Sequence, residues 1–118
     1  MQLHGLHHVT AVTGKVRDNL DFYTRVLGLR LVKKSVNQDD TSAYHLFYAD
    51  KVGSPGTDMT FFDWPQTGAD QRGTDSISNT LFRVNGQAAL DYWVTRLDEQ
   101  GVQHEPLQTF AGRAILRF

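Results

Sequence analysis

The chain has 118 residues, of which 40% are hydrophobic, and this is enough for one domain with a packed core but too few for two ordinary domains. Its 12 basic and 13 acidic residues give a net charge of -1 without long runs of either sign, which argues against nucleic acid or a membrane surface as a partner. The sequence has no cysteine and no apolar stretch near the roughly 18 residues that span a membrane, so we expect a cytoplasmic protein in which any metal is bound by nitrogen and oxygen ligands.

The first 65 residues predict a strand, a helix and three further strands. Residues 6–13 are rich in β-branched and small apolar side chains, which are typical of a strand. Residues 15–27 predict an amphipathic helix that ends at Gly28, because apolar residues recur at helical spacing: Val16, Leu20, Tyr23 and Leu27. The three strands that follow are predicted at residues 29–36, 43–49 and 59–64.

The helix segment Leu20–Leu27 (LDFYTRVL) is repeated seventy residues later as Leu90–Leu97 (LDYWVTRL). Such a repeat indicates that one supersecondary unit occurs twice. We therefore divide the chain into a first unit, a polar linker loop and a second unit, at residues 1–65, 66–78 and 79–118. The second unit predicts, in order, a strand, a helix and two strands, at residues 79–84, 87–100, 103–109 and 113–118, and it lacks a fourth strand. This order predicts an α+β fold, in which the helices cover the outer face of a cupped, mostly antiparallel sheet.

The first strand carries the strongest candidate for a functional side chain. Side chains alternate between the two faces of a strand, so His8 and Thr10 lie on one face while Val9 and Ala11 lie on the other. Val9 and Ala11 are suited to pack under the helix, which leaves His8 and Thr10 on the concave side, where a small molecule would bind. Spacing alone does not separate a ligand role for His8 from that of an ordinary hydrogen-bonded histidine.

The other histidines and the aromatic residues leave alternatives open. His45 lines the same concavity or forms a hydrogen bond inside the sheet, and alternation places it opposite Tyr44, Leu46 and Tyr48. His4 and His104 have polar surroundings and are expected to be solvated. One group of residues either floors an aromatic pocket or belongs to the core: Phe61, Phe62 and Trp64.

Several segments together resemble the vicinal-oxygen-chelate superfamily, which includes glyoxalase I, bleomycin-resistance proteins and extradiol dioxygenases. The resemblance covers essentially the whole chain and is most specific for the N-terminal part of the hydroquinone-type ring-cleaving dioxygenases. The segments that carry it are GLHHVT at residues 5–10, NLDFY at 19–23, LGLRLVKK at 27–34, YHLFY at 44–48 and GSPGT at 53–57, followed by TFF at 60–62 and WP at 64–65.

The resemblance implies paired βαβββ units that together form one glyoxalase-like domain around a divalent metal, usually Fe(II) in the ring-cleaving branch. Two histidines and one carboxylate hold the metal in that branch, and open positions bind the aromatic substrate and dioxygen. In this chain His8 matches the first metal ligand, and His7 and Thr10 match outer-shell positions. Residues suited to the remaining ligand positions of glyoxalase I are absent, because Asn79 stands in the second unit and Thr60, Phe61 and Phe62 stand in the fourth strand.

The resemblance therefore leads to two main hypotheses. In the first, the chain corresponds to the N-terminal portion of an iron-dependent extradiol dioxygenase that cleaves hydroquinone- or catechol-type rings, holds one of three ligands and is inactive alone. In the second, it is a metal-free small-molecule binding module like the bleomycin-resistance proteins, in which two chains share clefts that hold aromatic or chelating ligands. A third hypothesis is that a dimer rebuilds a site with His8 from each chain. The exposed sheet edge of the incomplete second unit predicts a homodimer.

Overall fold

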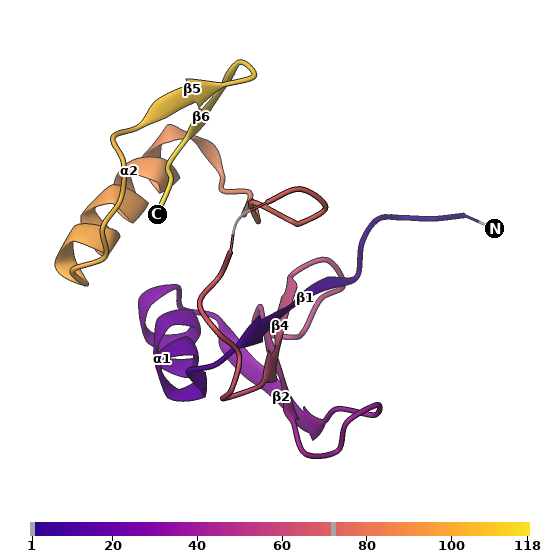
Figure 1. Ribbon diagram of the computed structural model, residues 1–118. Coiled ribbons are helices and arrows are strands. Elements are labelled where there is room, and N and C mark those ends of the chain that lie inside the picture. The colour runs from indigo at the N-terminus through magenta and orange to yellow at the C-terminus, as the bar shows by residue number, and fades with distance from the viewer. Residues whose placement is uncertain (1, 72) are drawn as a thin grey trace. The chain divides into compact units, whose positions relative to one another are not determined.

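A computed structural model describes residues 2–71 and 73–118 of the chain. Its elements form the α+β fold predicted from the sequence (Figure 1). The chain divides into two compact units, Met1–Asp70 and Gln71–Phe118. The first of these units contains all of the long strands and the residues that we singled out in the N-terminal half.

The first unit contains the strand, helix and three strands expected from the sequence. Each element begins and ends within a few residues of its predicted bounds. The elements are β1 (His8–Thr13), α1 (Val16–Asp21), η1 (Phe22–Val26), β2 (Arg30–Val36), β3 (Tyr44–Ala49) and β4 (Asp58–Asp63).

The four strands form one mixed sheet in the order β1-β4-β3-β2. β1 pairs with β4 in parallel, and the other two pairings are antiparallel. The parallel pairing sets His8 opposite Asp58 and Thr10 opposite Thr60, although about fifty residues separate the partners in sequence. The sheet register thus brings together side chains that no local sequence pattern connects.

The core of the first unit lies on one face of this sheet, against the helix. It is built from alternating residues of β3 and β4, which are almost fully buried: Leu46, Tyr48, Met59 and Phe61. Val9 and Ala11 of β1 pack against this cluster, as predicted, together with Tyr23 of the helix. Alternation along β1 consequently directs His8 and Thr10 to the opposite face, where both are exposed.

The helix differs from the predicted one in its second half. Residues Phe22–Val26 form a π-helical turn, in which the N–H of Leu27 donates to the carbonyl of Phe22 at 3.0 Å. A π-helix uses more residues per turn than an α-helix, so the apolar stripe changes phase and Val26 is buried rather than Leu27. The helix ends as expected at Gly28, whose φ of 73° suits a residue without a side chain. None of the described helices is long and apolar enough to cross a membrane.

The second unit contains the predicted helix, α2 (Gly86–Glu99), and a short hairpin, β5 (Gln108–Phe110) with β6 (Arg113–Ile115). The strand predicted at residues 79–84 is wrong, because these residues form no strand. In the first unit the equivalent strand, β1, is hydrogen-bonded to β4, and the described part of the second unit has no counterpart of β4. A strand forms only where a partner satisfies its backbone groups, so residues 79–84 stay outside any sheet.

Candidate functional site

The face of the sheet opposite the helix gathers the polar and aromatic side chains that the core does not use. We call it the site face and define it by residues of β1, β4 and β3: His8, Thr10, Asp58, Thr60, Phe62, His45 and Phe47. Lys33 of β2 joins its far side, directly opposite Phe47. His8 and Thr10 share one face, as predicted, and the register places His45 on the same face, which is one of the two alternatives left open for it.

His8 lies at the start of β1 with its neighbour His7 beside it. The two Nδ1 atoms are 3.1 Å apart, so one ring donates its hydrogen and the other accepts it. If His8 donates from Nδ1, its Nε2 carries the lone pair that a metal ligand needs. In many proteins a hydrogen-bond partner on one ring nitrogen, as His7 is here, orients a histidine that binds a metal through the other nitrogen.

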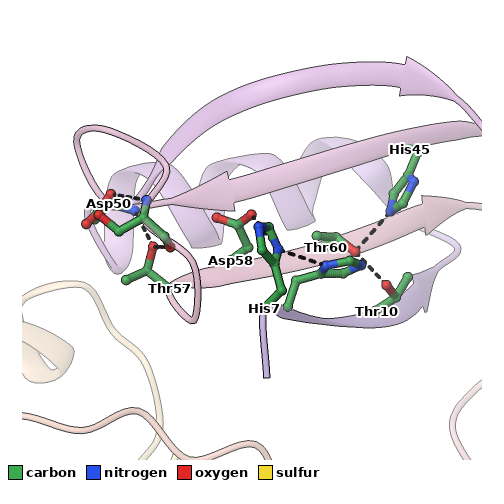
Figure 2. Close-up of polar contacts among 9 residues, drawn as sticks. His7, Thr10, His45, Asp50, Thr57, Asp58 and Thr60 are labelled. Atoms are coloured by element: carbon green, nitrogen blue, oxygen red, sulfur yellow. Dashed lines mark hydrogen bonds and ion pairs between the residues drawn. The ribbon is translucent and has the colours of Figure 1, made fainter. Parts of the chain in front are cut away.

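Asp58 completes this corner of the site face, and sequence reasoning missed it. Its Oδ2 lies 3.8 Å from Nδ1 of His7, and its side chain is only 9% exposed (Figure 2). The other carboxyl oxygen, Oδ1, is buried and has no hydrogen-bond partner in the described structure. A buried carboxylate normally has its oxygens paired, so this atom could still accept a hydrogen bond or hold a cation.

A second polar group crosses three strands. Nε2 of His45 lies 3.0 Å from Oγ1 of Thr60, which in turn donates to Oγ1 of Thr10 at 2.8 Å (Figure 2). Thr60 is completely buried, whereas Thr10 is exposed. Both alternatives left open for His45 therefore apply, because it lies on the site face and also forms a hydrogen bond inside the sheet.

Aromatic rings enclose the imidazole of His45. The ring centroids of Phe47 and Phe62 lie 4.1 and 4.2 Å from that of His45. Burial lowers the pKa of His45, and electrostatic interactions with His8 and Lys33 lower the pKa further. The imidazole is thus neutral at neutral pH, with one N–H and one lone pair. Phe62 belongs to this site face, while Phe61 belongs to the core.

The described residues do not assemble a complete metal site. Within residues 2–71 and 73–118, no three His, Cys, Asp or Glu side chains come together in a group that could hold a metal ion. His8 supplies an imidazole, and Asp58 a carboxylate near His7. Asp58 and Thr60 could have been found from sequence only by knowing that β1 pairs with β4, since local alternation gives faces but not register.

The structure also corrects the prediction that His104 is solvated. This residue belongs to the second unit, where its imidazole is 14% exposed and lies 3.1 Å from Oδ1 of Asp98. Its Nδ1 is 2.9 Å from the carbonyl oxygen of Glu105. The turn after α2 brings these groups together, so His104 holds that turn and is not part of the site face.

Comparison with known proteins places these features in context. Residues 5–115 match the family model of the Glyoxalase/Bleomycin resistance protein/Dioxygenase superfamily. The chain is 52% identical over 118 residues to a Bacillus subtilis (strain 168) protein named "Putative ring-cleaving dioxygenase MhqA", and the match covers 100% of this chain but 37% of that protein. It is 32% identical over 119 residues to the chlorohydroquinone/hydroquinone 1,2-dioxygenase of Sphingobium indicum, with 99% of this chain and 37% of that protein covered.

A solved structure shows the same arrangement of the backbone. The crystal structure of a "putative dioxygenase" from Bacillus subtilis subsp. subtilis str. 168 superimposes on this chain with a TM-score of 0.86 at 38% identity. The superposition covers 95% of this chain and 36% of that one. The chain therefore spans a little over a third of the length of the relatives it matches, and it is similar to their N-terminal portion.

Proposed function

Because the chain belongs to the Glyoxalase/Bleomycin resistance protein/Dioxygenase superfamily, we propose that it supplies part of the active site of a ring-cleaving dioxygenase acting on hydroquinone- or catechol-type rings. In this proposal the site face binds the aromatic ring, and His8 contributes one ligand to a divalent metal, with iron(II) the metal we expect. The other ligands come from outside the described residues, so we expect the chain alone to be inactive in ring cleavage.

The observation that carries this proposal is the position of His8 and Thr10 on the face away from the helix. Both are exposed there, and His7 lies beside His8 as a hydrogen-bond partner. The ring centroid of Phe47 lies 6.3 Å from that of His8, and Phe62 lies beside His45 on the same face, so both rings offer apolar contacts to an aromatic molecule. An imidazole with an outer partner, beside an aromatic surface, suits the binding of a phenolic compound next to a metal ion.

The metal that the family implies does not fit the described residues as a complete site. His8 is one imidazole, and no group of three candidate ligands exists among the residues that the structure describes. Affinity and geometry both depend on the full ligand set, so a single histidine holds such an ion weakly.

The lack of a three-ligand group among the described residues also favours a second candidate function. Without three convergent ligands, the site face could bind an aromatic molecule with no metal, as a binding module. The hydrogen-bonded His45 and the adjacent rings of Phe47 and Phe62 would then form the contact surface. The two candidates differ in what stabilises the protein: a divalent metal and a phenol together in the first, a phenol alone in the second.

Metal content measured beside a variant of His8 tests the first candidate. The purified chain is dialysed against Fe(II) or Mn(II) without oxygen, and bound metal is measured in the wild type, in His8→Ala and in His4→Ala as a matched control. We expect weak binding that His8→Ala removes and His4→Ala retains, because His4 lies before β1. Hydroquinone should also raise the melting temperature more in the presence of metal than in its absence.

Two outcomes would contradict the proposal. Equal, negligible metal in all three proteins, combined with stabilisation by hydroquinone alone, would favour the metal-free binding module. Oxygen uptake with hydroquinone by the pure 118-residue chain would instead show that the chain is active alone and that a full set of ligands forms without further protein.

A further inference from the structure

The helix α2 begins at an Asn-Gly pair, Asn85 and Gly86, whose backbone is not that of an ordinary helix start. Gly86 is the first residue of α2, yet its φ of 78° lies in the left-handed region. A side chain added at Gly86 would meet no atom within 4 Å, so the positive φ, and not crowding, is what favours glycine here. The chain therefore enters α2 through a left-handed turn.

Asn85 stands where an asparagine commonly caps a helix, but its side chain does not cap α2. An N-cap side chain normally accepts a hydrogen bond from the N–H two or three residues further on, and Asn85 makes no such bond. The return contact of a capping box is missing as well, because Ala88 stands at the third helical position. Both Asn85 and Gly86 are exposed. The side-chain amide of Asn85 is therefore in contact with solvent and is not held by the helix.

An amide in this position can react with its own backbone. The nitrogen of Gly86 forms a bond to Cγ of Asn85 and closes a succinimide ring, while the bond from Cγ to Nδ2 breaks. The proton lost by the Gly86 nitrogen leaves with Nδ2 as ammonia. A water molecule then opens the ring at one of its two carbonyls, which gives aspartate or isoaspartate, and no group is oxidised or reduced.

Two features of the pair favour this ring closure. Gly86 has no Cβ to obstruct the approach of its nitrogen to Cγ of Asn85. Residues 79–84 lie outside any sheet, and the first N–H groups of a helix have no partner within it. Rotation of the backbone at Asn85 consequently breaks none of the hydrogen bonds of a strand or of the helix interior.

The other three asparagines of the chain are each followed by a larger residue, and the fold restrains their side chains. Asn37 is 7% exposed, and its Oδ1 accepts a hydrogen bond from the N–H of Asp39 at 3.1 Å. Asn19 lies in α1 with its Oδ1 buried. Nδ2 of Asn79 donates to Oγ of Ser78 at 3.0 Å. The structure thus separates Asn85 from the rest.

We propose that Asn85 is a site of spontaneous deamidation, at which the folded chain presents its side-chain amide to the backbone nitrogen of Gly86. The proposal is independent of the proposed function, because Asn85 belongs to the second unit and not to the site face. The aspartate product adds a carboxylate just before α2, whose first turn has no acidic residue. A negative charge there interacts favourably with the helix dipole, so α2 tolerates this product.

Peptide mapping of the aged protein tests the proposal. The whole 118-residue chain is kept folded at mildly alkaline pH, where the backbone nitrogen loses its proton more readily, and mass spectrometry follows the replacement of NH₂ by OH at each asparagine. We expect conversion at Asn85 to be about tenfold faster than at any other asparagine. On isoelectric focusing the aged chain should gain an acidic band that migrates with freshly made Asn85→Asp.

Two variants control for the site. Asn85→Gln keeps an exposed amide on a longer side chain that closes a ring slowly, so the acidic band should not accumulate in it. Asn79→Gln should age as the wild type does. Circular dichroism checks that both variants are folded.

A parallel incubation in guanidinium chloride measures the effect of the fold. Asn85 should react at nearly the same rate in the folded and the unfolded chain, whereas Asn37 should react faster once unfolded. Conversion at Asn85 no faster than at Asn37 or Asn79 in the folded chain would overturn the inference. A marked acceleration at Asn85 on unfolding would overturn it too, because the fold would then protect this amide.

Discussion

Asp58 Oδ2 lies 3.8 Å from Nδ1 of His7, and the two side chains are exposed to very different extents, 9% for the carboxyl and 62% for the imidazole. The second carboxyl oxygen of Asp58 is buried without a hydrogen-bond partner in the described structure. A buried carboxylate with one distant partner lowers the stability of a fold. Such costs are typical of positions that a protein keeps for function rather than for stability.

Replacing Asp58 by Asn should therefore separate stability from ligand binding. Asn has the same shape without the charge, so we expect the free energy of unfolding to stay constant or to rise by about 1 kcal/mol. Binding of divalent metal to the chain should weaken, because His7 loses its anionic neighbour beside His8. Urea unfolding and metal retention measure the two effects, with Asp70→Asn, an exposed position, as the matched control. A loss of stability in Asp58→Asn would show instead that Asp58 is a structural residue.

Tyr48 is a second buried polar group without a partner, and it lies in the core. Its side chain is 0% exposed and its hydroxyl has no hydrogen-bond partner in the described structure. We expect Tyr48→Phe to leave the free energy of unfolding unchanged at pH 7 or to raise it by about 1 kcal/mol. Tyr44→Phe is the control, because Tyr44 is 47% exposed. A marked loss of stability in Tyr48→Phe would mean that this hydroxyl makes a favourable contact.

The free energies of unfolding of the wild type and of Tyr48→Phe should differ most at alkaline pH. Burial, with a smaller effect of Tyr23, raises the pKa of Tyr48 from 10.0 to about 12. Since this pKa is higher in the folded state, the folded protein resists ionisation, and stability present below about pH 10 is lost as the pH rises towards 12. The wild type should lose ~2 kcal/mol relative to Tyr48→Phe by pH 12. An equal change in the free energy of unfolding of both proteins over this pH range, measured by urea titration, would contradict this.

The sequence predicts those features of the fold that depend on local chemistry. Alternation in β1 assigns Val9 and Ala11 to the core and His8 to the other face, and the structure agrees. The ends of the helices are also predicted from the local sequence. Gly28 and Gly101 follow the two helices, and both have the positive φ that glycine adopts easily, 73° and 66°.

The rest of the candidate site depends on strand register, which a single sequence does not contain. Asp58 lies opposite His8, and Thr60 opposite Thr10, only because β1 pairs in parallel with β4 across a helix and two strands. The same limit explains the strand wrongly predicted at residues 79–84. Its β-like composition is not sufficient for a strand without a partner strand to receive its hydrogen bonds.

His104 predicts a pH-dependent stability for the second unit. Its Nδ1 lies 2.9 Å from the carbonyl oxygen of Glu105, and its Nε2 lies 3.1 Å from Oδ1 of Asp98. Both partners are acceptors, so both nitrogens must donate, and only the protonated ring does this. The carbonyl of Glu105 and, next, the carboxylate of Asp98 raise the pKa of His104 above 6.5. Stability from these contacts is complete below pH 6.5 and is lost as the pH rises through the higher folded value.

The measurement is thermal unfolding of the wild type and His104→Gln at several values between about pH 5 and pH 8. The wild type should unfold at a higher temperature than the variant at the acid end, and the difference should shrink as the pH rises. His4→Gln serves as the control and should follow the wild type, because His4 lies outside all elements. A difference that grows with pH would mean that neutral His104 makes the stronger contacts.

Unpaired backbone groups at a sheet edge and exposed apolar side chains predict that the chain associates into a homodimer. β1 is an outer strand of its sheet, and among the described strands it pairs with β4 only. Residues 79–84 lie outside any sheet, with Leu81 75% and Phe82 44% exposed. Free strand edges and exposed apolar residues favour pairing between chains, so light scattering should give twice the 13.3 kDa chain mass as concentration rises. Leu81→Lys should shift the equilibrium towards the monomer if residues 79–84 take part, and a wild type that stays monomeric at high concentration would refute the prediction.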